Sequence, residues 1–335
     1  MRIWFNHWFS TAYHLIKLMK KDFGEALTVV GSGSNSKAVY RQACDEWYSE
    51  PEMSTDCYVA FCLDFCSVHN IDVFVPRRSL VEISNNADSF EQIGVKLLLE
   101  KNKSVISMLD DKIQTYAFFK DRIPEIIPQY CLAHCLNEFN QAYNELQTEG
   151  IRLCYKLAID EGAKSFRVLD DSIESIKALY EKPGTKVTYR AAREILSDYD
   201  FKIPIILMEY MTGPDVSVDC METEGGRIII PRFKVGRFSE IRPDQEIIRI
   251  CHRVMDILCF EMPANIQFKM NNDWPYLLEI NPRMSGGLQL SCMATEINVP
   301  AIALRKCCGM SYEWHYPKQW APRGIVNLET PIIVS

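Results

Sequence analysis

The sequence predicts a protein of the mixed α/β and α+β class, and two observations support this prediction. Over residues 1–105, short apolar runs alternate with stretches whose apolar residues recur at helical spacing. Such alternation is typical of a parallel sheet covered by helices. From residue 203 onward, strand-like runs follow one another across turn residues, which indicates antiparallel pairing.

Composition limits the classes of function. The chain has 335 residues, of which 47% are hydrophobic and 24% charged, and a net charge of −7. This acidic balance argues against an extensive basic surface for nucleic acid. The start of the chain lacks the charge, apolar run and small-residue site of a signal peptide. The sequence has no run of about 18 apolar residues, so it predicts no membrane span. We therefore expect a cytoplasmic protein without nucleic-acid or membrane partners.

Thirteen cysteines are present, but none form a C-x-x-C pair or a set with zinc-like spacing. In a cytoplasmic chain this pattern predicts reduced thiols that behave as small buried hydrophobic groups.

The first 105 residues contain the elements of a parallel sheet. The pattern predicts strands over 2–5, 27–30 and 71–76, and helices over 11–20 and 58–66. Gly31 and Gly33 follow the second strand, but residue 36 is Ser where a dinucleotide fingerprint needs a third glycine, so a tight turn is favoured over a nicotinamide site. Arg77 and Arg78 follow the third strand, where open α/β sheets bind ligands. They are candidates for an anionic substrate, with surface arginines as the alternative.

The middle of the chain carries two notable lysines. Lys112 lies in a helix predicted over 108–120, ahead of an extended segment over 123–128 and a helix over 136–146. Lys156 lies inside an apolar strand predicted over 151–158, where its ammonium group needs a partner such as phosphate. A loop containing Gly162 and a helix over 170–180 follow.

Beyond residue 203 the pattern predicts a three-stranded meander over 203–211, 216–220 and 227–234, then a helix over 246–258. His252 on that helix is expected to be a satisfied helix histidine rather than a base. Arg232 and Lys234 share one face of the third strand by alternation, either toward a ligand or as exposed charge. Two closing helices are predicted over 288–294 and 299–305.

One hairpin concentrates groups that suit a divalent cation and phosphate. By alternation, Glu279, Asn281 and Arg283 point to one face of a strand, and Gln267 lies on the preceding strand. A turn near Asp273 would set Gln267 opposite Glu279. Mg²⁺ takes oxygen ligands, and arginine binds phosphate oxygens. The alternative is an amphipathic edge hairpin with a polar outer face.

The E-I-N-P-R-x-S-G-G run that contains Glu279, Asn281 and Arg283 resembles the metal-binding core of the ATP-grasp superfamily. Its carbamoyl-phosphate-synthetase-like and carboxylate–amine ligase branches are the most similar. The resemblance implies a Rossmann-like domain over 1–105, a small ATP-grasp subdomain over 106–202 and a large one over 203–335. It also implies Mg²⁺, or Mn²⁺ in its place, and ATP. The implied metal ligands are Gln267, Glu279 and Asn281, the implied catalytic residues are Arg283 and Lys156, and the implied nucleotide contacts are Lys112, Lys156, Glu209, Tyr210, Met211, Asp215, Arg232 and Lys234.

The same resemblance implies an ATP-dependent ligase. Such an enzyme activates a small carboxylate as an acyl phosphate and joins it to an amine or a thiol, releasing ADP and phosphate, and a homodimer is expected by analogy. Two alternatives stay open. One is a carbamoyl-phosphate-synthetase-like enzyme that only forms the acyl phosphate. The other is an ATP-binding regulatory protein that has lost catalysis, because the loop around Gly162 has fewer glycines than the family's phosphate loop.

Overall fold

The structure is a computed structural model that describes residues 1–335 except 148–150, 160–163, 174–183, 318–319 and 327–335. The chain divides into two compact units. Unit 1 comprises Met1–Leu109, Pro214–Phe268 and Leu278–Ser335, and unit 2 comprises Asp110–Gly213 and Lys269–Leu277. The α/β and α+β class is confirmed, because one sheet is parallel and the others are antiparallel or mixed.

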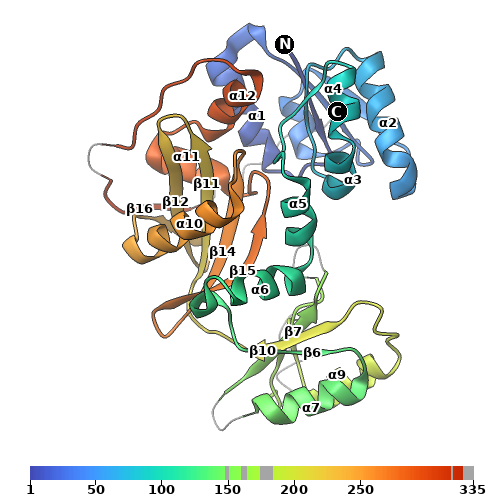
Figure 1. Ribbon diagram of the computed structural model, residues 1–335, viewed down its shortest axis with the longest axis vertical. Coiled ribbons are helices and arrows are strands. Elements are labelled where there is room, and N and C mark those ends of the chain that lie inside the picture. The colour runs from blue at the N-terminus through green and yellow to red at the C-terminus, as the bar shows by residue number, and fades with distance from the viewer. Residues whose placement is uncertain (148–150, 160–163, 174–183, 318–319, 327–335) are drawn as a thin grey trace. The chain divides into compact units, whose positions relative to one another are not determined.

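Unit 1 begins with a five-stranded parallel sheet in the order β3-β2-β1-β4-β5 (Figure 1). Its strands are β1 (Arg2–Asn6), β2 (Thr28–Gly33), β3 (Glu46–Ser49), β4 (Val73–Val75) and β5 (Lys96–Leu97). Because strand side chains alternate, Ile3 and Phe5 pack on one face with α1 (Ala12–Phe23), and Trp4 packs on the other with α2 (Thr55–Val68). Helices on both faces make this the Rossmann-like arrangement that the sequence predicts.

Gly31 on β2 serves packing. A Cβ atom at Gly31 would lie 2.5 Å from Cys44 Sγ and 2.9 Å from Trp47 on the neighbouring strand. The first glycine of the G-x-G pair is therefore needed for the close approach of a tryptophan, which accounts for it without a dinucleotide. Three further helices follow in this part of unit 1. They are α3 (Leu80–Asn85), α4 (Ala87–Gln92) and α5 (Lys103–Asp110).

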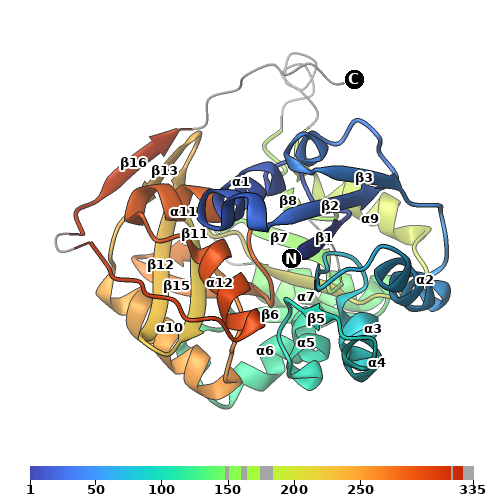
Figure 2. The same cartoon turned by 90° about the horizontal axis from the view of Figure 1, so that it is seen from above.

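The second sheet of unit 1 has the order β15-β14-β11-β12-β13-β16. Its strands are β11 (Asp215–Thr223), β12 (Gly226–Val235), β13 (Phe238–Ile241), β14 (Ala264–Asn271), β15 (Trp274–Asn281) and β16 (Arg323–Val326). Helix α10 (Gln245–Leu258) packs on β12. Helices α11 (Leu288–Thr295) and α12 (Val299–Cys308) contact α1 (Figure 2), and their apolar residues share one core with α1 and β1. The two sheets of unit 1 thus belong to one hydrophobic core.

Unit 2 is built on a sheet with the order β6-β10-β7-β8-β9. Its strands are β6 (Tyr130–Ala133), β7 (Leu153–Leu157), β8 (Arg167–Leu169), β9 (Lys186–Val187) and β10 (Ile205–Glu209). Phe139 on α7 (Leu136–Leu146) and Ala192 on α9 (Tyr189–Ser197) pack with the sheet residues Tyr155 and Leu207 in one buried cluster. The sequence predicted the first of these helices, the amphipathic helix over 136–146.

Two sequence predictions are wrong in this region. The helix predicted over 108–120 is two helices, because Asp111 leaves helical geometry and caps α6 (Lys112–Lys120) by accepting from the amides of Ile113 and Gln114. The three-stranded meander is also wrong, since β10 pairs with β6 and β7 rather than with β11. Four consecutive residues of β10, 205–208, are buried, which requires a central strand. The predicted helix over 170–180 lies mostly outside the described residues.

Candidate functional site

A row of hydrogen-bonded polar side chains runs along the end of β15. Arg283 Nη2 donates to Asn281 Oδ1 at 3.2 Å, and Asn281 Nδ2 donates to Glu279 Oε1 at 3.0 Å. All three side chains are half-buried. The prediction is confirmed for Glu279 and Asn281 on β15, whereas Arg283 lies in the bend just after the strand. Its guanidinium group is held next to the amide of Asn281, which in turn contacts the carboxylate of Glu279.

The preceding strand adds a second pair. Gln267 Nε2 donates to Asn265 Oδ1 at 3.1 Å, so both side chains lie on the same face of β14. Strands β14 and β15 are neighbours joined by Asn272 and Asp273, whose φ angles of 49° and 62° are left-handed. A two-residue turn of this kind is the favoured hairpin connection. The hairpin near Asp273 is confirmed, while the pairing of Gln267 with Glu279 stays a prediction.

The chemistry of these donors fits Mg²⁺. Glu279, Gln267 and Asn281 offer one carboxylate and two amides, an oxygen set that suits a hard cation which also takes ligands from substrate phosphates. Within the described part of the chain, no group of three or more His, Cys, Asp or Glu side chains could hold a metal ion. A metal bound here would thus depend on amide oxygens and on a bound nucleotide.

A buried carboxylate on β11 accepts hydrogen bonds from residues next to this row. Asp219 on β11 is 3% exposed. Its Oδ1 accepts from Asn265 Nδ2 at 2.9 Å and Ser285 Oγ at 2.7 Å, and its Oδ2 accepts from Ser291 Oγ at 2.6 Å. Asp219 therefore joins β11, β14, the loop after β15 and α11.

Arg232 on β12 completes the buried network. Its Nη2 lies 3.6 Å from Asp219 Oδ2 and donates to Ser217 Oγ at 3.1 Å. A Cβ atom at Gly287 would lie 2.4 Å from the guanidinium carbon, so only glycine leaves room there. The Nε atom of Arg232 is buried and has no hydrogen-bond partner among the described residues. Lys234, two residues on, is exposed and lies opposite Asp215 in the β11–β12 pair.

The remaining predicted nucleotide contacts lie in unit 2. Lys112 opens α6 and is 8% exposed, an unusual burial for lysine. Lys156 is half-buried on β7, where its register partner is Ile206 on β10. Each lysine has an electrostatic or hydrogen-bonding partner. The predicted phosphate loop around Gly162 lies outside the described residues.

The end of β10 contacts the tip of the β14–β15 hairpin within unit 2. Glu209 Oε1 accepts from Asn271 Nδ2 at 3.2 Å, and a Cβ atom at Gly213 would lie 2.5 Å from the carbonyl oxygen of Met270. The amide of Tyr210 donates to the carbonyl of Arg152 at 2.7 Å, and Met211 is 5% exposed. The backbone that follows β10 is therefore fixed in place.

Comparisons with known proteins agree with this geometry. Residues 201–330 match the family described as "ATP-grasp in the biosynthetic pathway with Ter operon". The structure is similar to N5-carboxyaminoimidazole synthetase from Staphylococcus aureus complexed with ADP, with a TM-score of 0.70 at 13% identity over 98% of this chain and 82% of that one. This chain therefore resembles an ATP-grasp family over residues 201–330, and its fold is similar to that of the synthetase.

Two more comparisons extend over most of the chain. The arginine-specific large chain of carbamoyl phosphate synthase from Bacillus subtilis is 20% identical over 316 residues, which are 88% of this chain and 28% of that protein. The biotin carboxylase domain of Hydrogenobacter thermophilus 2-oxoglutarate carboxylase, in complex with MgADP, ADP and bicarbonate, has a TM-score of 0.66 at 15% identity. It matches 94% of this chain and 71% of that one. The chain spans just over a quarter of the length of the synthase.

The structure also places Phe9, which the sequence pattern did not single out, beside two arginines that it did. The guanidinium carbons of Arg77 and Arg283 lie 5.2 Å and 5.4 Å from the ring centre of Phe9. Phe9 follows β1, and Arg77 follows β4, so this arginine pair meets where the strand order of the sheet reverses. Phe9 carried no motif, and only its place just after a predicted strand could have suggested it.

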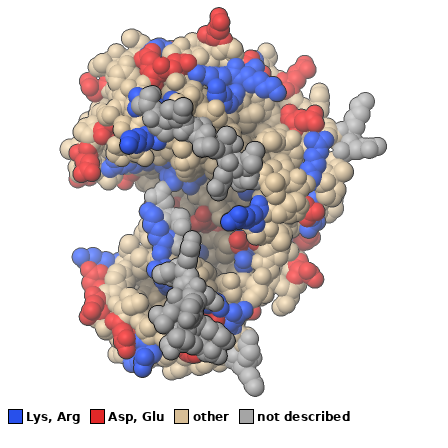
Figure 3. All heavy atoms as spheres, turned by 180° about the vertical axis from the view of Figure 1, so that it is seen from behind, with Lys and Arg blue, Asp and Glu red and all other residues tan. Residues whose placement is uncertain are grey.

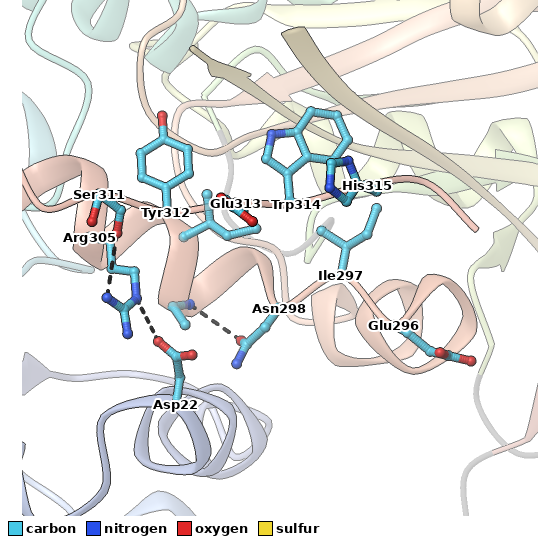
Figure 4. Close-up of a pocket in the computed structure, with 12 residues that line it drawn as sticks. Asp22, Glu296, Ile297, Asn298, Arg305, Ser311, Tyr312, Glu313, Trp314 and His315 are labelled. Atoms are coloured by element: carbon cyan, nitrogen blue, oxygen red, sulfur yellow. Dashed lines mark hydrogen bonds and ion pairs between the residues drawn. The ribbon is translucent and has the colours of Figure 1, made fainter. Parts of the chain in front are cut away.

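A cavity of about 490 Å³ lies elsewhere in unit 1 (Figure 4). Its polar side chains are largely engaged with their surroundings. Arg305 Nε donates to Asp22 Oδ2 at 2.7 Å, and Asn298 Nδ2 donates to the carbonyl of Leu18 at 2.8 Å. None of the predicted site residues line it. The candidate site is therefore not located by cavity size.

On the face shown in Figure 3, Lys and Arg side chains lie among Asp and Glu side chains, so this face carries both signs of charge. Among the helices that the structure describes, none is both long and apolar enough to cross a membrane.

Proposed function

We propose that this protein is an ATP-dependent, ADP-forming ligase that activates a small carboxylate as an acyl phosphate and joins it to an amine or a thiol. The row formed by Glu279, Asn281 and Arg283 is the main support, because it places a metal ligand beside a phosphate-binding guanidinium group. The match of residues 201–330 to an ATP-grasp family and the likeness in fold to a synthetase complexed with ADP support the same proposal.

Each residue has a role in this proposal. Glu279, Asn281 and Gln267 would hold Mg²⁺, which supplies charge neutralisation at the phosphates. Arg283 binds the oxygens of the transferring phosphoryl group, and Lys156 and Lys112 neutralise phosphate charge. Glu209, the backbone of Tyr210 and Met211, and the carboxylate of Asp215 contact the nucleoside. Arg232 stabilises the buried network through its ion pair with Asp219, and Lys234 faces phosphate. Phosphoryl transfer is catalysed by positioning and electrostatics, so no protein nucleophile is required.

The test is release of ADP, distinguished from AMP, from Mg·ATP incubated with pooled small carboxylates and amines. We expect ADP release that depends on the pool and falls at least 100-fold in Glu279→Gln, which keeps the shape of the side chain but removes its charge. Glu224→Gln, at the exposed β11–β12 turn, is the matched control. Release of AMP and pyrophosphate would contradict the acyl-phosphate mechanism.

A second candidate rests on the relation to carbamoyl phosphate synthase over 88% of this chain. It would form an acyl phosphate without joining it to an amine itself. ADP release that requires a carboxylate or bicarbonate but no amine would favour this alternative. Binding of Mg·ATP with no turnover under any condition would favour an ATP-binding regulatory protein.

A further inference from the structure

A histidine–carboxylate pair lies at the carboxyl end of the parallel sheet in unit 1. His7 follows β1, and Glu50 follows β3. His7 Nε2 lies 2.6 Å from Glu50 Oε2. The Glu50 side chain is fully buried, whereas that of His7 is 22% exposed. One end of the imidazole thus contacts an interior carboxylate while its ring still reaches solvent.

The other hydrogen bonds to the Glu50 carboxylate come from neutral groups. Ser32 Oγ donates to Glu50 Oε1 at 2.5 Å, and the Tyr58 hydroxyl donates to Oε2 at 3.0 Å. Among the described residues, no lysine or arginine hydrogen bonds to Glu50. A buried carboxylate is costly without a charged partner. His7 contacts Glu50 and becomes such a partner when its imidazole takes up a proton.

The geometry also fixes which ring nitrogen is available. A carboxylate only accepts hydrogen bonds, so Nε2 of His7 carries the hydrogen and Nδ1 carries the lone pair. His7 has a φ angle of 47°, a left-handed conformation that is disfavoured for side chains with a Cβ atom. Its amide donates to the carbonyl of Ser32 at 3.0 Å, which helps to hold this backbone in place. Such strain is typical of functional positions.

The pair lies next to the segment that carries Arg283. Trp8, the next residue, lines a small cavity of about 10 Å³ together with Pro76 and Arg283. The Phe9 ring lies under Arg283, and a Cβ atom at Gly286 would lie 3.5 Å from that ring. The loop that begins with His7 therefore packs against the loop that begins after β15, at the reversal of strand order where open α/β sheets bind ligands.

We propose that His7, oriented by Glu50, is the general base that accepts a proton from the amine substrate. This assignment rests on the proposed ligase function. The amine nitrogen attacks the carbonyl carbon of the acyl phosphate and forms the C–N bond, and its proton moves to Nδ1 of His7. The C–O bond to phosphate then breaks, and phosphate leaves with the electron pair. Glu50 stabilises the imidazolium, which later returns the proton to water.

Hydroxylamine separates this step from activation. It is an uncharged, strong nucleophile at neutral pH, so it traps an acyl phosphate as a hydroxamate without needing a base. The readout is the ratio of amide to hydroxamate, with the carboxylate and amine that the pooled screen identifies. His7→Asn is the main variant, because asparagine tolerates the left-handed backbone. His14→Asn, at an exposed position on α1, is the control.

We expect the ratio to fall at least 100-fold in His7→Asn and at least 10-fold in Glu50→Gln. In His7→Gly, added imidazole should restore amide formation, which a merely structural role of the ring would not allow.

Two outcomes would overturn the assignment. One is a ratio in His7→Asn within threefold of the wild-type value. The other is an equal loss of amide and hydroxamate, which would place the pair in structure or carboxylate binding. A wild-type protein that releases no ADP and forms no hydroxamate with any carboxylate would instead overturn the proposed ligase function, and this assignment with it.

Discussion

At the scale of single residues, a substitution of Asp219 should strongly lower the free energy of unfolding. Asp219→Asn would leave the guanidinium group of Arg232 buried without its ion-pair partner. Breaking a buried pair in this way costs about 3–5 kcal/mol. Urea unfolding of the two proteins gives the difference in the free energy of unfolding. Glu222→Gln, which breaks a more exposed pair with Arg227, should cost less than about 1 kcal/mol. Equal effects of the two substitutions would contradict this ranking.

A second residue-scale prediction concerns Glu46 and acid. Two hydrogen bonds from Arg2, followed by one from the Tyr48 hydroxyl, lower the pKa of Glu46 from 4.5 to about 2. Because the folded pKa lies below the unfolded one, the ionised carboxylate stabilises the fold above about pH 4.5, and this contribution disappears as the pH falls toward 2.

The comparison of wild type with Glu46→Gln by urea unfolding at several pH values checks this. The Glu46 side chain is about a third exposed, so we expect a difference below about 1 kcal/mol at pH 7 that shrinks steadily below pH 4.5. A difference that does not change with pH would exclude this linkage.

At the scale of elements, the hairpin turn before β15 offers a stabilising change. Asp273 has a φ angle of 62°. In this region the backbone conformation of a residue with a Cβ atom is roughly 1 kcal/mol less favourable than that of glycine. Asp273→Gly creates the Asn-Gly pair that two-residue turns prefer. We expect a higher free energy of unfolding by about 0.5 kcal/mol after the entropy of glycine is subtracted. Asp121→Gly, at an exposed position with a φ angle of −87°, should not stabilise.

The sequence predicted elements well where local patterns decide them and poorly where pairing does. Alternation placed Glu279 and Asn281 on one face, because a strand has only two faces, although Arg283 lies just beyond the end of the strand. The membership of β10 in the sheet of unit 2 was missed, because the turn residues 212–215 suggested local pairing with β11. Strand partners are set by long-range burial, which a short window of sequence does not contain. His7 and Phe9 were missed for the same reason, since their partners are supplied by strands far along the chain.

At the scale of the whole molecule, the thirteen cysteines give a simple test of the fold. All thirteen are free thiols, and Cys57, Cys135 and Cys259 are the exposed ones. Burial raises the pKa of Cys66, Cys154, Cys292 and Cys307 to about 12, so these thiols stay protonated and unreactive at neutral pH.

We therefore expect a thiol reagent at pH 7.5 to label about three cysteines quickly in the native protein and all thirteen in urea. Mass spectrometry of the labelled peptides identifies the sites, and an alkylation series without prior reduction checks that no disulfide is present. Rapid native labelling at Cys66 or Cys292 would contradict the described core.

The network around Asp219 has an evolutionary consequence. Its four partners lie on β12, β14, the loop after β15 and α11; three donate hydrogen bonds to its two oxygen atoms and Arg232 forms an ion pair. A lineage that replaces the carboxylate removes an acceptor of Asn265, Ser285 and Ser291 and the ion-pair partner of Arg232 at once. Among descendants of this chain, these five positions should therefore either persist together or be exchanged together for an apolar set, and a lineage that keeps the donors without the acid should be rare.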